Sequence, residues 1–448
     1  MKPYRVRIEF AKTSPEKINV TESANPHISW AIASGSETQS ARRVNDACAA
    51  DVCDVIAHDN NTRVIVAHEG RPFWDTGWVN AAGQNVKYSG NPLTEGEVYD
   101  LSVQLRGSNG EESPPEHVRF CPGQLSHWPA KWLCEKDARE DAVVSFFRDI
   151  DLPADAAAAC LFVSGLGYHK IYVNGQCVFD DPLNPAFSEY DKRCYYQVLP
   201  GIENFLRGGK NRLGVRVAAG WRSPANVCYQ LNKCTADFAG PTQMSAALRV
   251  RYSNGRIEWF ISDEQWQYFY DPVVYSNIFM GERYEAAKCL PDWSVPGRTI
   301  ENCYSAIETS ASCGKMTPQT LEPVCCREMY PAISVVREAS ADIVDFGQNI
   351  AGVCRIRIPR NAAPGQVIEI LHAEILDEDG RLFTAPLRRA KSVDTYVAAG
   401  NGKDPEFWQP EFTYHGFRYA EVRGLADPLL KEDITAIALY TDIAFYPT

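Results

Sequence analysis

The residues best suited to metal binding lie near the C-terminus, where one residue separates His372 from Glu374 and His415 follows. In a β-strand, side chains two positions apart point to the same face, so His372 and Glu374 would offer two ligands to one ion. The spacing identifies no third ligand. A core histidine hydrogen-bonded to a neighbouring acid is the more common arrangement, and we predict that structure here.

Two other patterns predict structure rather than chemistry. The glycine-rich stretch from Phe205 to Lys210 lacks the spacing of a phosphate-binding loop, and we interpret it as a turn. The chain has 15 cysteines with scattered spacing, no CxxC pair and one adjacent pair, Cys325-Cys326. Without a signal peptide, this usage favours reduced, buried thiols over a disulfide framework, and it disfavours structural zinc.

Composition and charge exclude some partners. The 448 residues carry a formal net charge of −12, whereas binding to nucleic-acid phosphates needs a basic face. The most apolar stretch, Ala154 to Val163, is too short to span a bilayer. Charged residues occupy the N-terminus, where a signal peptide needs an apolar core. We therefore expect no nucleic acid, no membrane and a cytoplasmic location.

The elements that must position any site are β-strands. Residues 1–122 contain short alternating runs broken by turns, which predict a sandwich of the fibronectin type III or immunoglobulin kind. Trp30 is expected in its core, and Tyr99 opens a late strand where such sandwiches often place a corner tyrosine.

Residues 123–300 are again rich in predicted strands and contain two hairpin signals. Asn174-Gly175 and Asn254-Gly255 each separate two alternating apolar runs, the strongest short-range signal for a β-hairpin. We predict a jelly-roll sandwich for this segment.

Residues 301–448 form a third β-rich block after a less patterned link. Cys354–Ile358 and Gln366–Glu374 alternate cleanly between apolar and polar residues. The one apolar helix candidate of the chain, Asp151 to Ala159, is short. The predicted fold class is all-β, with three consecutive sandwiches.

Several strings of the second and third blocks resemble one enzyme family in order and spacing. In the second block they are Gly165-Leu166-Gly167-Tyr168, Tyr190-Asp191-Lys192-Arg193, Gly220-Trp221 and Gly281-Glu282-Arg283-Tyr284. In the third they are Asp345-Phe346-Gly347-Gln348-Asn349, His372-Ala373-Glu374, Asp394-Thr395-Tyr396 and Tyr414-His415-Gly416-Phe417-Arg418-Tyr419. The chain resembles the N-terminal β-domains of bacterial α-L-rhamnosidases.

This resemblance implies an inverting glycoside hydrolase that removes terminal L-rhamnose with an acid and a base in an (α/α)6 barrel. The second block would be a jelly-roll, galactose-binding-like module, and the third a concanavalin-like supersandwich. The sequence stops near the point where the barrel should begin, so we expect a shortened chain or one piece of a split protein, without catalytic residues. Asp345, Glu374 and Glu282 lie in matching strings, but we expect them to cap turns or to pair with arginines such as Arg388 and Arg418.

The jelly-roll block offers the most interesting ligand site, because a related module in some family members binds L-rhamnose with calcium. Asp180, Asp181 and Asn184 supply two carboxylates and an amide after a hairpin strand, which suits a calcium ion. Trp221 or Tyr229 could stack on a sugar, and Asn226 could bond its hydroxyls. The competing interpretation is a polar turn with prolines and a core tryptophan.

We therefore expect a non-catalytic portion of an α-L-rhamnosidase that supports the barrel and binds rhamnose-bearing glycans or glycosides. One alternative is a hydrolase whose site is completed by a barrel on a second chain. The other is a set of purely structural β-domains, in which changes at Asp180, Asp181 or Trp221 alter stability at most.

Overall fold

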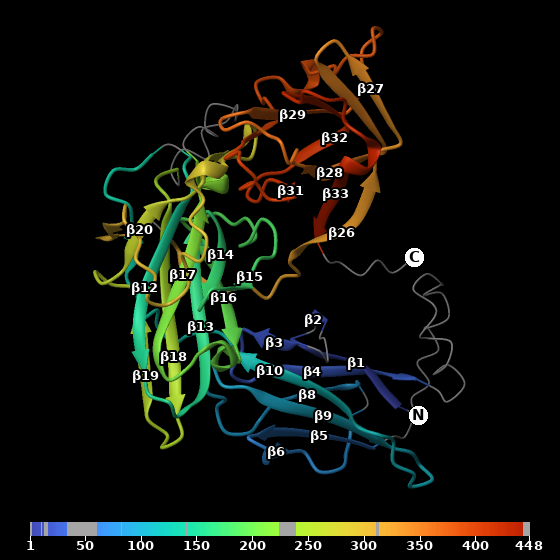
Figure 1. The fold of residues 1–448 in the computed structure, drawn as a ribbon. Coiled ribbons are helices and arrows are strands. Elements are labelled where there is room, and N and C mark those ends of the chain that lie inside the picture. The colour runs from blue at the N-terminus through green and yellow to red at the C-terminus, as the bar shows by residue number, and fades with distance from the viewer. Residues whose placement is uncertain are drawn as a thin grey trace.

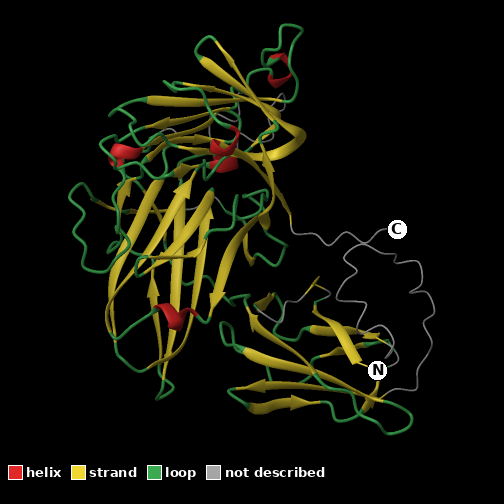
Figure 2. Cartoon of the chain, turned by 45° about the vertical axis from the view of Figure 1, so that its right-hand side comes forward, coloured by secondary structure: helices red, strands yellow, loops and turns green. Residues whose placement is uncertain are grey.

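The computed structural model describes residues 2–9, 11–12, 17–33, 61–81, 83–139, 141–223, 239–310 and 313–441. Strands dominate these residues, as predicted, and they gather into three bodies (Figures 1 and 2). The helical turns of the described part are five short 3₁₀ helices: η2 (Ile202–Phe205), η3 (Gly220–Arg222), η6 (Ala286–Lys288), η7 (Ala385–Leu387) and η8 (Lys431–Asp433). None of its helices is long and apolar enough to cross a membrane.

The N-terminal body, blue in Figure 1, is a sandwich of two sheets. One sheet has the order β2 (Ala11–Lys12), β1 (Lys2–Ile8), β4 (His27–Ala33), β8 (Asn85–Lys87). The other has the order β3 (Ile18–Thr21), β10 (Glu116–Pro122), β9 (Tyr99–Arg106), β5 (Asn61–His68), β6 (Arg71–Asp75), with β7 (Val79–Asn80) beside β5. Trp30 is buried in the core, and the buried Tyr99 hydroxyl accepts a hydrogen bond from the Thr94 N–H at 2.9 Å.

The middle body is a second sandwich. Its first sheet has the order β24 (Ile307–Thr309), β11 (Trp132–Cys134), β18 (Gln243–Tyr252), β13 (Ala156–Leu166), β16 (Arg193–Pro200), β25 (Lys315–Pro318), with β19 (Ile257–Ile261) beside β18. Its second has the order β15 (Gln176–Phe179), β14 (Tyr168–Val173), β17 (Gly209–Ala218), β12 (Val144–Leu152), β20 (Gln267–Tyr270), β23 (Tyr304–Ser305). Apolar side chains of both sheets form one large core between them.

The C-terminal body, orange and red in Figure 1, is built on one ten-stranded sheet. Its order is β21 (Val273–Asn277), β22 (Gly281–Glu285), β30 (Val393–Val397), β29 (Val367–Ala373), β32 (His415–Arg423), β28 (Ala341–Arg357), β33 (Ile434–Thr441), β26 (Val324–Pro331). β27 (Ser334–Glu338) and β31 (Phe407–Trp408) also pair with β28, whose 17 residues span the sheet.

Strand pairing crosses the predicted boundary at residue 300 in both directions. β21 and β22 precede residue 300, yet β22 pairs in parallel with β30 of the C-terminal sheet. β23, β24 and β25 follow residue 300 but pair with strands of the middle body. The chain therefore passes between these two bodies more than once, which ties the jelly-roll and C-terminal sheets together.

Both predicted hairpins are confirmed, and the short helix candidate at Asp151–Ala159 forms strands instead. β12 ends at Leu152, the chain turns after Pro153, and β13 begins at Ala156. Pairing of β13 with β18 and β16 outweighs the helix propensity of alanine, because so short a run makes only a marginal helix by itself. β14 and β15 turn at Asn174-Gly175, and β18 and β19 turn beside Gly255.

Candidate functional site

A cavity of about 380 Å³ lies between the jelly-roll domain and the C-terminal sheet. The jelly-roll domain contributes Lys170, Asp180, Asp181 and Pro182 to its lining. The C-terminal side contributes Cys325, Cys326, Val353, Gln409, Pro410, Glu411, Thr413 and Leu439. Carboxylates, an ammonium, an amide and a hydroxyl thus surround an apolar floor, a mixture that suits a polar ligand with carbon-bound hydrogens.

The β14–β15 hairpin places the two aspartates at the cavity. Asn174 and Gly175 have φ values of 51° and 87°, as a tight two-residue turn requires. The Asn174 side chain donates to the Phe205 carbonyl at 2.7 Å, which fixes this turn on the domain. β15 ends at Phe179, so Asp180 and Asp181 leave the sheet at the cavity wall.

Two cationic side chains of the jelly-roll domain form ion pairs with Glu411. Its carboxylate accepts from Lys170 Nζ and from Arg216 Nη1, each at 2.7 Å. Burial alone would raise the Glu411 pKa, but the charges of Arg216 and Lys170 outweigh it and lower the pKa to about 2. Arg216 is buried and also binds both oxygens of Asp271 at 2.8 Å.

Asp180 and Asp181 have no such partner. Within the described residues, neither carboxylate forms an ion pair. Burial raises the pKa of Asp181. Carboxylate oxygens that line a cavity without an ion-pair partner are the kind of ligand that divalent cations and hydroxyl groups bind.

The other predicted ligands lie elsewhere. Asn184 is buried, and its Oδ1 accepts from Gln319 Nε2 at 2.8 Å, so this amide is held inside the domain rather than at the cavity. The half-buried Trp221 packs against Phe187 and Phe279, with ring centroids 5.2 and 6.0 Å away, as a packing residue does. Asn226 and Tyr229 lie outside the described residues.

The three acids in the matching strings have structural partners. Asp345 forms a two-pronged ion pair with Arg418 at 2.9 and 3.0 Å, as predicted, whereas Arg388 forms no ion pair within the described residues. Glu374 is exposed and accepts from Asn349 Nδ2 at 3.1 Å.

Glu282 is buried, and its two oxygens accept from the Glu411 and Phe412 N–H groups at 3.0 and 2.9 Å. Burial, with the nearby charges of Glu411 and Asp394, raises the Glu282 pKa to about 8. None of the three acids lines this cavity, and each is held by a partner elsewhere in the structure.

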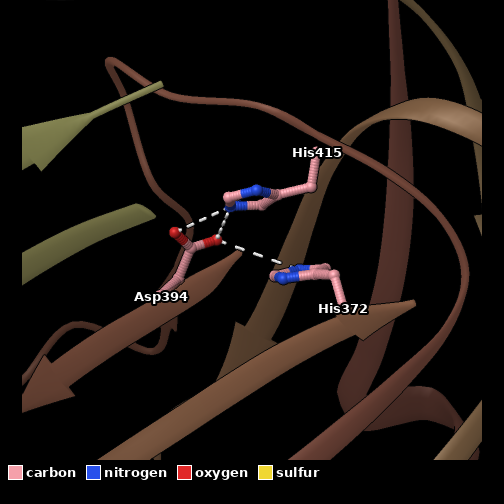
Figure 3. Close-up of side chains that lie close together, drawn as sticks. All are labelled: His372, Asp394 and His415. Atoms are coloured by element: carbon pink, nitrogen blue, oxygen red, sulfur yellow. Dashed lines mark hydrogen bonds and ion pairs between the residues drawn. The ribbon is translucent and has the colours of Figure 1, made fainter. Parts of the chain in front are cut away.

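A second cluster of polar side chains lies inside the C-terminal sheet (Figure 3). His415 Nε2 is 3.0 and 3.1 Å from the two oxygens of Asp394, and His372 Nε2 is 3.9 Å from Oδ2. The two imidazoles stack with centroids 4.3 Å apart. His372 is a buried core histidine, as predicted, but it donates to the Ser392 carbonyl rather than to an acid; the acid beside the two histidines is Asp394, and Glu374 is exposed.

Spacing alone could not identify Asp394, although it lies in one of the strings that carry the resemblance. Asp394 belongs to β30, which pairs with β29 so that Ile370 opposes Asp394. His372, two positions from Ile370, therefore comes close to Asp394 on the same face. The pairing of β29 with β30 supplies the missing third group, and only the sheet order shows it.

Three family models match the chain in consecutive segments. They are the Rha78A-like N-terminal immunoglobulin domain at residues 3–121, the α-L-rhamnosidase N-terminal domain at 154–328 and the bacterial α-L-rhamnosidase concanavalin-like domain at 337–440. The chain therefore consists of three β-rich domains that match, in order, the immunoglobulin-like, N-terminal and concanavalin-like domains of α-L-rhamnosidases. It belongs to the bacterial α-L-rhamnosidase family.

Relatives agree with this assignment. An α-L-rhamnosidase of Formosa agariphila is 29% identical over 470 residues, covering 97% of this chain and 47% of the relative. One of Streptomyces avermitilis is 31% identical over 296 residues, covering 64% and 27%. The structure of an α-L-rhamnosidase from Dictyoglumus thermophilum superposes with a TM-score of 0.82 at 26% identity, covering 99% of this chain and 49% of that one. The chain thus spans less than half the length of these curated relatives.

Proposed function

We propose that this chain forms the non-catalytic β-domains of an α-L-rhamnosidase, which support an (α/α)6 catalytic barrel and bind terminal L-rhamnose of glycans or glycosides. The observation that carries the proposal is the cavity, which Asp180 and Asp181 line without forming an ion pair within the described residues. L-rhamnose is the proposed ligand because the curated relatives are named α-L-rhamnosidase.

Calcium fits this cavity in part. Asp180 and Asp181 would hold the ion, and the Gln409 and Thr413 side chains of the opposite wall are further oxygen donors. Asn184 would not take part, because its oxygen is already a hydrogen-bond acceptor inside the domain. A bound calcium would supply a positive charge that coordinates sugar hydroxyls.

An exposed apolar surface supports a packing role toward the rest of such an enzyme. Met329, Ile333, Val336 and Leu430 are 68%, 55%, 54% and 55% exposed. The last lies beside Ile333, because Lys431 Nζ donates to the Ile333 carbonyl at 2.6 Å. Large apolar side chains that gather at one edge of a sheet are typical of a contact surface.

Calorimetric titration with L-rhamnose, run with calcium and again with a chelator, tests the binding proposal. We expect heat with calcium, no heat with the chelator and no heat in Asp181→Asn. Asp191→Asn, an exposed aspartate of the same domain that does not line the cavity, is the matched control and should bind like the wild type. Folded wild-type protein that gives no heat in either condition would leave purely structural domains.

A hydrolysis assay separates the remaining alternative. We expect no release from 4-nitrophenyl α-L-rhamnoside by this chain alone, because its candidate acids are held by Arg418, backbone N–H groups and Asn349. Release that appears only after addition of a second chain carrying the barrel would favour a split hydrolase. Release by this chain alone would contradict the proposal.

A further inference from the structure

The buried cluster of His372, Asp394 and His415 has the composition of a metal site, and no part of the proposed carbohydrate function uses it. One ligand atom from each residue can be chosen so that all three lie within 4.8 Å of one another, and all three side chains are buried. They come from three adjacent strands, β29, β30 and β32. Figure 3 shows both imidazoles on one side of the Asp394 carboxylate.

The strand geometry explains why two histidines meet here. Along β32 the buried positions change from His415 and Phe417 to Ala420 and Val422. His372 opposes Ala420, so it faces the same interior as His415. The change of face across residues 418 and 419 therefore brings together two histidines that a regular alternation would separate.

One imidazole nitrogen of the cluster, His372 Nε2, accepts no hydrogen bond from the described residues. His372 Nδ1 lies 2.9 Å from the Ser392 carbonyl oxygen, which can only accept, so Nδ1 carries the hydrogen. His372 Nε2 then presents a lone pair. It is buried, has no hydrogen-bond partner among the residues that the structure describes, and lies 3.9 Å from a carboxylate oxygen that is also an acceptor.

Two facing acceptors in a dry interior cost free energy unless a cation lies between them. Asp394 is already oriented for such a cation, because its Oδ1 accepts the Glu282 N–H at 3.0 Å. The Ser392 carbonyl orients His372 in the same way. Outer hydrogen bonds of this kind, which fix the tautomer of a histidine and the pose of a carboxylate, typically surround metal ligands.

We propose that His372, Asp394 and His415 bind one divalent transition-metal ion of the zinc class. Imidazole nitrogens with a carboxylate favour such ions over calcium or magnesium. Ligand–metal distances of about 2.0–2.2 Å place tetrahedral ligand atoms roughly 3.3 Å apart, between the 3.0 and 3.9 Å separations observed here. The cluster thus offers one ligand atom from each of three residues.

Binding requires a change of tautomer and a turn of the rings. His415 Nε2 now donates to Asp394; to offer this nitrogen's lone pair to the ion, the neutral ring must carry its hydrogen on Nδ1 instead, with no net release of a proton. The imidazoles are inclined by 26° and stacked, so each must rotate until its Nε2 lone pair points at a common centre. Because all three side chains are buried, the ion enters while the domain folds.

The test is therefore refolding. The denatured full chain is refolded with Zn²⁺ or Co²⁺, passed through a chelating column and analysed for metal and protein. We expect about one zinc per chain, the stoichiometry of a closed structural site, and a melting temperature above that of protein refolded with chelator. The cobalt form should show ligand-field bands without thiolate charge transfer.

Three variants test whether metal retention depends on this site. His372→Gln should lower retained zinc at least about tenfold, as loss of a direct ligand does. His169→Gln replaces an equally buried histidine of the jelly-roll domain, and it should retain the metal. Asp181→Asn should also retain it, so this site and the proposed calcium site fail independently.

Wild-type protein that refolds to its native circular dichroism spectrum without zinc and without cobalt bands would overturn the proposal. Equal zinc in the wild type and in His372→Gln would overturn it too. If His372→Gln does not fold, the wild-type cobalt spectrum and stoichiometry still decide.

Discussion

The jelly-roll domain contacts its N-terminal and C-terminal neighbours through the same arrangement of charges. In each interface a glutamate of the neighbouring domain pairs with two cationic side chains of the jelly-roll domain. At the N-terminal interface, Glu97 accepts from Arg249 at 2.7 Å and from Arg251 at 2.9 Å. At the C-terminal interface, Glu411 accepts from Lys170 and Arg216, each at 2.7 Å.

The two interfaces differ in what surrounds the glutamate. The Glu97 side chain is 4% exposed, and a Cβ added at the neighbouring Gly96 would lie 3.2 Å from Cys160. The Glu411 side chain is 27% exposed and lines the cavity with Asp180 and Asp181. A sealed interface can only join domains, whereas an open one leaves polar groups for a ligand. The comparison therefore supports the second interface as the place of the proposed binding.

The largest effect is expected at the sealed interface. Glu97→Gln leaves the buried Arg249 without its counter-charge, while Arg251 keeps only the exposed Glu69, and we expect a loss of about 3–5 kcal/mol in the free energy of unfolding. Urea denaturation followed by tryptophan fluorescence measures it. Glu95→Gln, two residues away, should change little. A loss below about 1 kcal/mol would show that the arginines find other partners or water.

At the open interface the equivalent change should cost less. In Glu411→Gln, Arg216 keeps Asp271, so we expect a loss of about 1–3 kcal/mol at neutral pH. The pKa of this carboxylate is about 2 in the folded protein, below its ordinary value of 4.5. Its contribution is therefore complete above pH 4.5 and is lost as the pH falls toward 2.

Between pH 4.5 and 2, the free energy of unfolding should fall less with decreasing pH in Glu411→Gln than in the wild type. Urea denaturation at several pH values measures this slope. The expected difference comes from Glu411 alone, so Glu95→Gln should follow the wild-type slope. Parallel curves for wild type and Glu411→Gln would mean that Glu411 is not the acid-sensitive group of this interface.

Lys170→Met separates packing from charge at the same interface. The methionine keeps an apolar stem in the cavity wall, and Glu411 keeps Arg216, so we expect a loss of about 1 kcal/mol. The pH range over which the free energy of unfolding falls at acid pH should also shift, because one of the two charges that lower the Glu411 pKa is gone. Stability and pH dependence identical to the wild type would show that Arg216 alone holds this glutamate.

Local patterns in the sequence predicted local structure well. The Asn174-Gly175 hairpin, the buried Trp30 and the corner role of Tyr99 each follow from a few neighbouring residues, and the structure confirms them. The all-β class and the family follow from several such strings together. The helix candidate at Asp151–Ala159 forms strands instead, because pairing of β13 with β18 and β16 outweighs the local helix propensity.

Contacts between distant residues could not be predicted. Arg216 and Glu411 are 195 residues apart, and neither carries a local signal. The His372 cluster lacked its third member for the same reason, since Asp394 reaches it through strand pairing. Of the three predicted calcium ligands, Asp180 and Asp181 line the cavity because a local hairpin positions them. The Asn184 side chain instead points into the domain and accepts from Gln319, a partner 135 residues away.

The smallest effect is expected at the rim of the sealed interface. Glu69 accepts from Arg251 Nη2 at 2.7 Å, but its side chain is 61% exposed and Arg251 keeps Glu97. We expect Glu69→Gln to cost about 0–1 kcal/mol and to cost less still at high salt, because solvent and ions screen the pair. The urea midpoint at low and high salt measures both. A cost equal to that of Glu97→Gln would place the stabilising charge at the rim, and the contrast between a sealed and an open interface would fail.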